Sequence, residues 1–159
     1  MSAVGHSILK DRMTSEGALL AGEMSGHIYF ADRYYGFDDA LYAAARLMEI
    51  RASRAEPLSA WFADIPCKPA SPELRVDCAD TAKFAVVARC AEQFSALGYD
   101  IVDIDGVRFT SDTGWGLVRA SNTQPALVMR AEADTADRLG ELLALLNHVV
   151  NSALEQVGA

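Results

Sequence analysis

The sequence predicts a fold of two parts, an α/β layer over residues 1–65 and an α+β part over residues 73–159. Three observations lead to this prediction. Short apolar strand patterns alternate with helical patterns in the first part. Prolines cluster over residues 66–72, which is typical of a linker. In the second part, two amphipathic helical patterns accompany alternating strands, which indicates an antiparallel sheet with two helices on one face.

Helical spacing and short apolar runs predict the elements of the first part. We expect a helix that is entered through Ser7, because Leu9 and Met13 recur at helical spacing. Asp38 is predicted to be the N-cap of a helix over residues 40–50, since a short carboxylate accepts hydrogen bonds from the unpaired N–H groups of a first turn. The remaining elements expected here are strands over residues 18–21 and 28–30 and a short helix over residues 58–62.

The second part contains the strongest hairpin signal of the chain, Asp105-Gly106 between two apolar runs. We therefore expect strands 101–104 and 107–110 to pair. Asp80 is predicted to cap a helix that ends near Gly98, and Asp134 or Thr135 should open the last helix. The remaining strands expected are 74–78, 117–119 and 127–132, and the buried helix faces are residues 84, 87, 91, 94 and 97, then residues 139, 142, 143, 146, 149, 150 and 154.

Composition excludes several classes of protein. A net charge of −8 repels nucleic acid and anionic membrane surfaces, so we expect neither as a partner. An apolar fraction of 51% is enough for a real core, and the apolar runs are too short to span a membrane. Cys67, Cys78 and Cys90 are odd in number and lack C-x-x-C spacing, which favours reduced thiols in a cytoplasmic protein over disulfides or a zinc site.

A polar loop follows the strand at residues 117–119. The sequence GWGLVRASNTQP, residues 114–125, places Arg119, Ser121, Asn122 and Thr123 within five positions. A guanidinium, two hydroxyls and a carboxamide supply the donors that a phosphate requires, and turn N–H groups add an anion-binding nest. The alternative is an ordinary hairpin loop whose arginine pairs with a surface carboxylate.

A second polar segment, GEMSGH at residues 22–27, follows the apolar strand at 18–21. It presents Glu23, Ser25 and His27 between two glycines, which let a backbone approach a ligand closely. A carboxylate that accepts hydrogen bonds from two neighbouring hydroxyls is a common means of holding a sugar ring. Alternatively, the segment is a tight turn with a capping serine.

Together, GEMSGH and GWGLVRASNTQP resemble two loops of the α-D-phosphohexomutases, specifically the phosphomannomutase/phosphoglucomutase branch. The segment Gly5-His6-Ser7, the GFDD sequence at residues 36–39 and the helix after it also fit the family pattern in order and spacing. The branch assignment depends on Met24 and Asn122.

The resemblance implies a partial α/β layer, the end of the third mutase domain, followed by the fourth, C-terminal domain. No segment resembles the family's phosphoserine loop or its metal loop. We therefore expect the C-terminal piece of an enzyme, with no metal or cofactor of its own, whose magnesium is held by absent residues. The missing N-terminal mutase domains are expected partners. Apolar surface left uncovered in the first part favours dimerisation, or fraying of about the first thirty residues.

The resemblance also implies an isomerase reaction, in which a phosphoryl group moves between the 1- and 6-positions of mannose or glucose phosphates through a bisphosphate intermediate. Arg119, Ser121, Asn122 and Thr123 would hold the phosphate that is not reacting. Among the remaining residues, His6, Glu23 and Ser25 are expected to contact the substrate, and His27 is expected to transfer protons as a catalytic residue.

Structural alternatives remain for two of these residues. His27 is equally suited to satisfy a backbone group, and the alternative for Glu23 is to cap a helix or to pair with Arg33. The alternative function is a stand-alone phosphosugar-binding or oligomerising module without catalysis.

Overall fold

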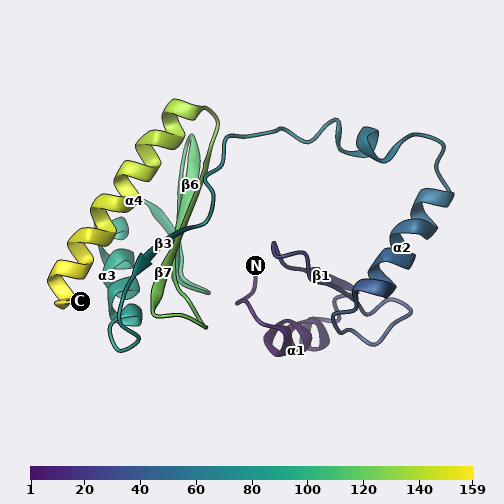
Figure 1. Ribbon diagram of the computed structural model, residues 1–159, viewed down its shortest axis with the longest axis horizontal. Coiled ribbons are helices and arrows are strands. Elements are labelled where there is room, and N and C mark those ends of the chain that lie inside the picture. Colours follow the sequence, from purple (N-terminus) through teal and green to yellow (C-terminus); the bar gives the residue numbers. More distant parts are fainter. The chain divides into compact units, whose positions relative to one another are not determined.

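The computed structural model describes all 159 residues, and they form two units, Met1–Pro66 and Cys67–Ala159. In the first unit (Figure 1), helix α1, His6–Glu16, precedes a hairpin of β1, Leu20–Gly22, and β2, Ile28–Phe30. Helix α2, Ala40–Ala52, and the short 3-10 helix η1, Leu58–Phe62, complete it. The two strands, expected at 18–21 and 28–30, are confirmed with the first displaced toward Gly22.

Only a small core holds the first unit together. Leu9 and Met13 of α1 and Tyr29 of β2 are buried against one another. Helix α2, by contrast, has no buried residue, and Leu41 and Met48 are largely exposed. The apolar surface expected on the helices of this part is therefore present.

Two helix starts in the first unit differ from the sequence-based expectation. Asp39, not Asp38, is the N-cap of α2, and its Oδ1 accepts the N–H of Tyr42 at 2.9 Å. Asp38 is turned toward the hairpin instead, because it makes a hydrogen bond with His27 there. Helix α1 starts at His6 after Gly5, so Ser7 lies inside its first turn and caps nothing.

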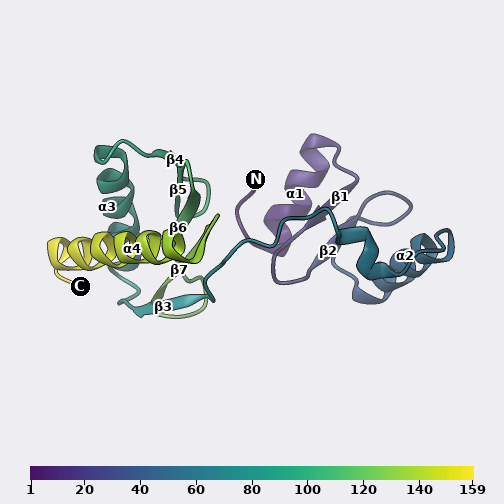
Figure 2. The ribbon, with the colours of Figure 1, turned by 90° about the horizontal axis from the view of Figure 1, so that it is seen from above.

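The second unit is a five-stranded antiparallel sheet in the order β3-β7-β6-β5-β4. Helices α3, Lys83–Ala96, and α4, Ala136–Val157, contact each other and lie on the same face of the sheet (Figures 1 and 2). This confirms the predicted architecture of the second part. The strands are β3, Leu74–Asp77; β4, Asp100–Val102; β5, Val107–Ser111; β6, Gly114–Ala120; and β7, Ala126–Ala133.

The hairpin signal at Asp105-Gly106 is borne out, because β4 and β5 pair antiparallel with Val102 opposite Arg108. Helix α4 has Thr135 as its N-cap, whose hydroxyl accepts the N–H of Arg138 at 3.3 Å. The core between helices and sheet contains the side chains of Val86, Cys90, Phe94, Val107, Phe109, Val118, Leu127, Met129, Leu142, Leu146, Val149 and Val150.

The buried face of α3 is rotated by about one position from the prediction. Val86, Cys90 and Phe94 are fully buried, whereas Phe84 and Leu97 are 64% and 58% exposed. Both faces of this helix are apolar in sequence, so spacing alone does not distinguish them. Asp80 does not cap α3, because the N-cap residue is Ala82. The carboxylate of Asp80 pairs with Lys83 instead.

Candidate functional site

Three of the predicted substrate-contacting residues converge at one end of the first unit. His6 lies in the first turn of α1, and Glu23 and His27 lie at the two ends of the β1–β2 turn. One ligand atom from each side chain lies within 4.8 Å of the others. The imidazole rings of His6 and His27 meet edge to face, with centroids 4.6 Å apart. We call His6, Glu23 and His27 the histidine–glutamate cluster.

Backbone hydrogen bonds of the turn bring Glu23 and His27 opposite each other. The N–H of Glu23 donates to the carbonyl of His27, and the N–H of Gly26 donates to the carbonyl of Glu23, both at 2.9 Å. Gly26 has a φ of 93°, which residues with a side chain rarely adopt. Ser25 lies exposed on this turn, between Glu23 and His27 in sequence.

The carboxylate of Glu23 is held from two sides. Its Oε1 accepts the N–H of Gly5 and its Oε2 accepts the hydroxyl of Tyr29, each at 3.2 Å. Burial of Tyr29, together with the nearby charge of Glu23, raises the pKa of this phenol to about 12. Glu23 does not pair with Arg33, which binds Glu49 instead. Sequence reasoning missed Tyr29, although its place on a strand two residues after His27 was visible.

Asp38 orients the imidazole of His27. Its Oδ2 lies 2.6 Å from Nδ1 of His27, and the histidine side chain is 42% exposed. A carboxylate at Nδ1 holds a proton there, so Nε2 is the nitrogen left to accept or donate a proton. The side chain of His27 therefore bonds to a carboxylate rather than to a backbone group. Asp38 was predicted as a helix cap, and its role here was missed.

The second polar loop lies in the other unit, where β6 ends. Arg119 pairs with Asp105 in the loop between β4 and β5, Nη1 to Oδ2 at 3.3 Å, with both side chains about one-quarter exposed. Ser121 is buried, and its Oγ accepts the N–H groups of Thr123 at 3.4 Å and Gln124 at 3.2 Å. Asn122 and Thr123 are exposed on the loop. The loop is therefore organised by Ser121, and Arg119 already has one acidic partner.

A buried lysine holds this loop through hydrogen bonds to its backbone carbonyls. Lys83, in the first turn of α3, has a side chain only 8% exposed. Its Nζ donates to the carbonyl of Ser121 at 2.6 Å, to Oδ1 of Asp80 at 2.7 Å and to the carbonyl of Gln124 at 3.4 Å. Lys83 therefore connects both ends of the loop to α3. The helical pattern had marked this segment as a packing face, so sequence reasoning did not single it out.

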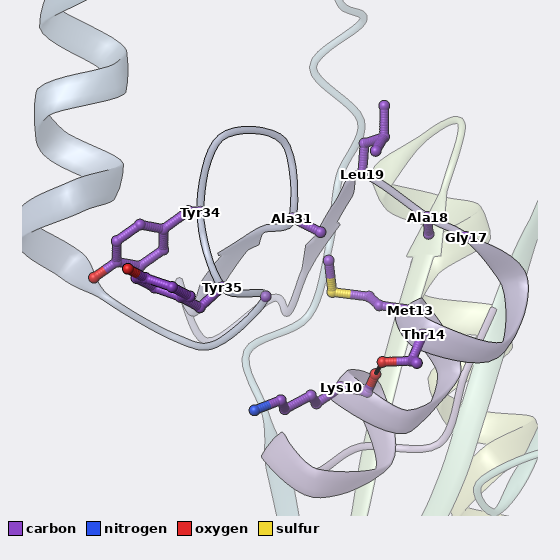
Figure 3. A pocket seen from close by; sticks show the side chains of 10 residues that line it. Lys10, Met13, Thr14, Gly17, Ala18, Leu19, Ala31, Tyr34 and Tyr35 are labelled. Atoms are coloured by element: carbon purple, nitrogen blue, oxygen red, sulfur yellow. Dashed lines mark hydrogen bonds between the residues drawn. The ribbon is translucent and has the colours of Figure 1, made fainter.

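A separate hollow of about 270 Å³ lies in the first unit between α1 and the loop after β2. Figure 3 shows Lys10, Met13 and Thr14 of α1 along one side and Tyr34 and Tyr35 along the other. Tyr34 stacks on Tyr42 with ring centroids 3.8 Å apart. No residue of the histidine–glutamate cluster lines this hollow.

Two family models match the chain. The model described as phosphoglucomutase/phosphomannomutase, alpha/beta/alpha domain III, matches residues 1–68. The model described as phosphoglucomutase/phosphomannomutase, C-terminal domain, matches residues 73–148. Together they take in both polar loops. None of the helices combines the length and the apolar character that spanning a bilayer requires.

Curated relatives and a solved structure are similar over most of this chain. A phosphomannomutase/phosphoglucomutase of Pseudomonas aeruginosa PAO1 is 44% identical over 87% of the chain, which covers 30% of that protein. A phosphoglucomutase of Neisseria gonorrhoeae is 40% identical over 96% of the chain and 33% of its own length. The crystal structure of a family protein from Burkholderia thailandensis, 38% identical, superposes with a TM-score of 0.83 over 96% of this chain and 32% of that one. The chain thus spans about a third of these proteins.

Proposed function

This chain belongs to the phosphoglucomutase/phosphomannomutase family, and from that premise we propose that it supplies sugar and phosphate recognition to a hexose-phosphate mutase. The reaction is the isomerase reaction that interconverts hexose 1-phosphate and hexose 6-phosphate in the cytoplasm. The observation that carries the proposal is the convergence of His6, Glu23 and His27 at one end of the β1–β2 hairpin.

In this proposal, Glu23 and Ser25 bind ring hydroxyls and His6 contacts the sugar or its phosphate. The fixed position of the Glu23 carboxylate supports this, because Gly5 and Tyr29 hold it without a neutralising cation. His27 takes the proton of the attacking sugar hydroxyl on Nε2 and returns it to the leaving oxygen in the second half-reaction. Asp38 stabilises the imidazolium that exists between these two steps, since its carboxylate lies 2.6 Å from Nδ1.

The loop at residues 119–123 is proposed to hold the phosphate that is not reacting. Arg119 would supply the positive charge, and Asn122, Thr123 and the hydroxyl proton of Ser121 the further donors. To bind the phosphate, the guanidinium of Arg119 has to contact Asp105 and the phosphate together, or to leave Asp105. That exchange lowers the affinity of the loop, because part of the gain from the phosphate offsets a lost ion pair.

Magnesium does not fit the histidine–glutamate cluster. Two imidazoles with one carboxylate differ from the all-oxygen set that Mg²⁺ prefers. We therefore propose that the mutase's magnesium is held by domains outside this chain, which would also be its partners in the assembled active site. Exposed apolar side chains of α2, among them Leu41 and Met48, support either contact with such domains or dimerisation.

The test is an NMR titration of the chain with mannose 1-phosphate and, separately, glucose 1-phosphate in a buffer containing EDTA. We expect shifts at residues 119–123 and at residues 22–27. Arg119→Ala should abolish the first set and keep the fold. Arg138→Ala is the matched control, because this arginine pairs with Glu141 on the exposed face of α4. Shifts that persist in Arg119→Ala would refute the role of the loop.

The alternative is a module that binds phosphosugars or oligomerises without catalysis. Its distinguishing observation is the absence of turnover when the chain is supplied with the remaining family domains. If the chain instead supports turnover in that assay, as the mutase proposal requires, His27→Ala should abolish the turnover while the sugar phosphate still binds. Turnover at the wild-type rate in His27→Ala would exclude its proposed part in proton transfer.

A further inference from the structure

We propose that the histidine–glutamate cluster is also a binding site for a transition-metal dication of the zinc class, occupied in competition with the sugar. Metal binding depends on the geometry of the first unit alone, and only the competition with the sugar rests on the proposed function. His6, Glu23 and His27 each contribute one ligand atom, and these atoms lie within 4.8 Å of one another.

The distances are close to those of a three-ligand metal site. Bonds of about 2.1 Å at tetrahedral angles separate two donor atoms by about 3.4 Å. Each pair in the cluster therefore has to approach by no more than about 1.4 Å. His6 provides most of this movement, because its side chain is 59% exposed, whereas Glu23 stays anchored by Gly5 and Tyr29. The His6 ring then shifts against the rings of His27 and Tyr29, which it contacts edge to face.

The surroundings of His27 resemble the support that metal-ligating histidines receive. Such histidines usually donate their second ring N–H to a carboxylate, which fixes the tautomer and increases the basicity of the ligating nitrogen. Asp38 makes this contact with Nδ1 of His27 at 2.6 Å, so Nε2 is the nitrogen available to a metal. The hydroxyl of Tyr29 supports Glu23 in a different way, because it donates to Oε2 at 3.2 Å and so orients the carboxylate.

The donor set determines the class of metal. Two imidazole nitrogens and one carboxylate suit Zn²⁺, Co²⁺ or Ni²⁺ rather than Mg²⁺ or Ca²⁺. Three protein ligands leave one position open for water or a ligand oxygen. Because the same side-chain atoms are proposed to bind the sugar hydroxyls, a bound metal should exclude the sugar from this end of the unit.

The experiment measures Co²⁺ binding by visible absorption and Zn²⁺ binding by calorimetry on the full chain. All proteins carry Cys67→Ser, because Cys67 is the exposed thiol and a thiolate would bind zinc by itself. His148→Ala is the matched control, since His148 is the third histidine of the chain and lies exposed on α4. NMR spectra without metal establish that each variant is folded.

We expect one metal ion per chain with the absorption of four-coordinate Co²⁺. Asp38→Asn should weaken binding by about 10- to 100-fold, and loss of the ligands themselves in His6→Ala or His27→Ala should weaken it at least as much. His148→Ala should bind like the parent protein. Affinity that survives in His27→Ala, or that is lost in His148→Ala, would overturn the proposal.

Two further measurements keep the test decisive if a variant does not fold. Co²⁺ added to the parent protein should broaden the amide signals of residues 5–7 and 22–29 first, and broadening centred elsewhere would overturn the site. Zn²⁺ should also displace mannose 1-phosphate from residues 22–27. If the sugar binds in EDTA but no metal binds without EDTA, only the metal proposal fails and the proposed function stands.

Discussion

Replacement of Lys83 by methionine isolates the polar support of the phosphate loop. Methionine keeps the unbranched stem of lysine but removes the ammonium group, so packing against α3 is largely retained. The lost interactions are the hydrogen bonds from Nζ to the carbonyls of Ser121 and Gln124 and the ion pair with Asp80. We expect the second unit to become less stable and the loop to become mobile.

The three interactions differ in weight. The bond to Ser121, 2.6 Å long and buried, is worth about 1.5–3 kcal/mol because its donor is charged. The bond to Gln124 is 3.4 Å long and adds little. Asp80 is 68% exposed and is hydrated once the lysine is gone, so its pairing also contributes little. Allowing for the burial cost that the neutral side chain avoids, we expect a loss of about 2 kcal/mol in the free energy of unfolding.

The assay is urea unfolding followed through the amide signals of the second unit, with exchange rates measured at residues 121–125. Lys68→Met is the matched control, because the Lys68–Asp134 pair has a similar length of 2.7 Å but is about half exposed on both sides. This control should lose much less stability and leave the loop amides protected. Equal losses in Lys83→Met and Lys68→Met, or an unchanged exchange rate in the loop, would refute the reasoning.

Two further outcomes follow from the structure. Gly106→Ala should lower the free energy of unfolding by roughly 2–4 kcal/mol in the same assay. The reason is that φ is +83° at this position and an added Cβ atom would lie 2.4 Å from the carbonyl oxygen of Val118. A loss of stability smaller than that of Lys68→Met would contradict this expectation. The folded-state pKa of Tyr29 is raised from 10.0 to about 12, so its stabilising contribution is complete below pH 10 and is lost as the pH rises toward 12. Tyr29→Phe should therefore flatten the stability profile in that window, and parallel profiles would show that Tyr29 does not titrate as described.

Much of the second unit was predictable because its signals are local. Asp105-Gly106 identified the β4–β5 hairpin, and the apolar repeat of α4 identified the helix that covers the sheet. In the first unit, the bounds of β2 and η1 agree with the prediction. Turn chemistry and hydrophobic periodicity act over a few residues, so one sequence is enough to show them.

The candidate site was predictable only in part. His6, Glu23 and His27 were chosen from their residue types and from the family resemblance, and the structure brings these three together. Asp38 and Asp39 are chemically identical neighbours, so nothing local indicates which one caps α2 and which one faces His27. That choice depends on where the hairpin lies relative to the start of the helix.

The sequence by itself determined the order of strands and helices, the two polar loops and the family. Only the tertiary structure decided which face of α3 is buried, that Lys83 supports the phosphate loop, that Asp105 already pairs with Arg119, and that Asp38 and Tyr29 orient His27 and Glu23. The physical reason is the separation along the chain between the residues that interact. Periodicity and turn preference are properties of short segments, whereas these contacts join residues on different elements, 6 to 38 positions apart in the chain, and exist only after the elements have packed.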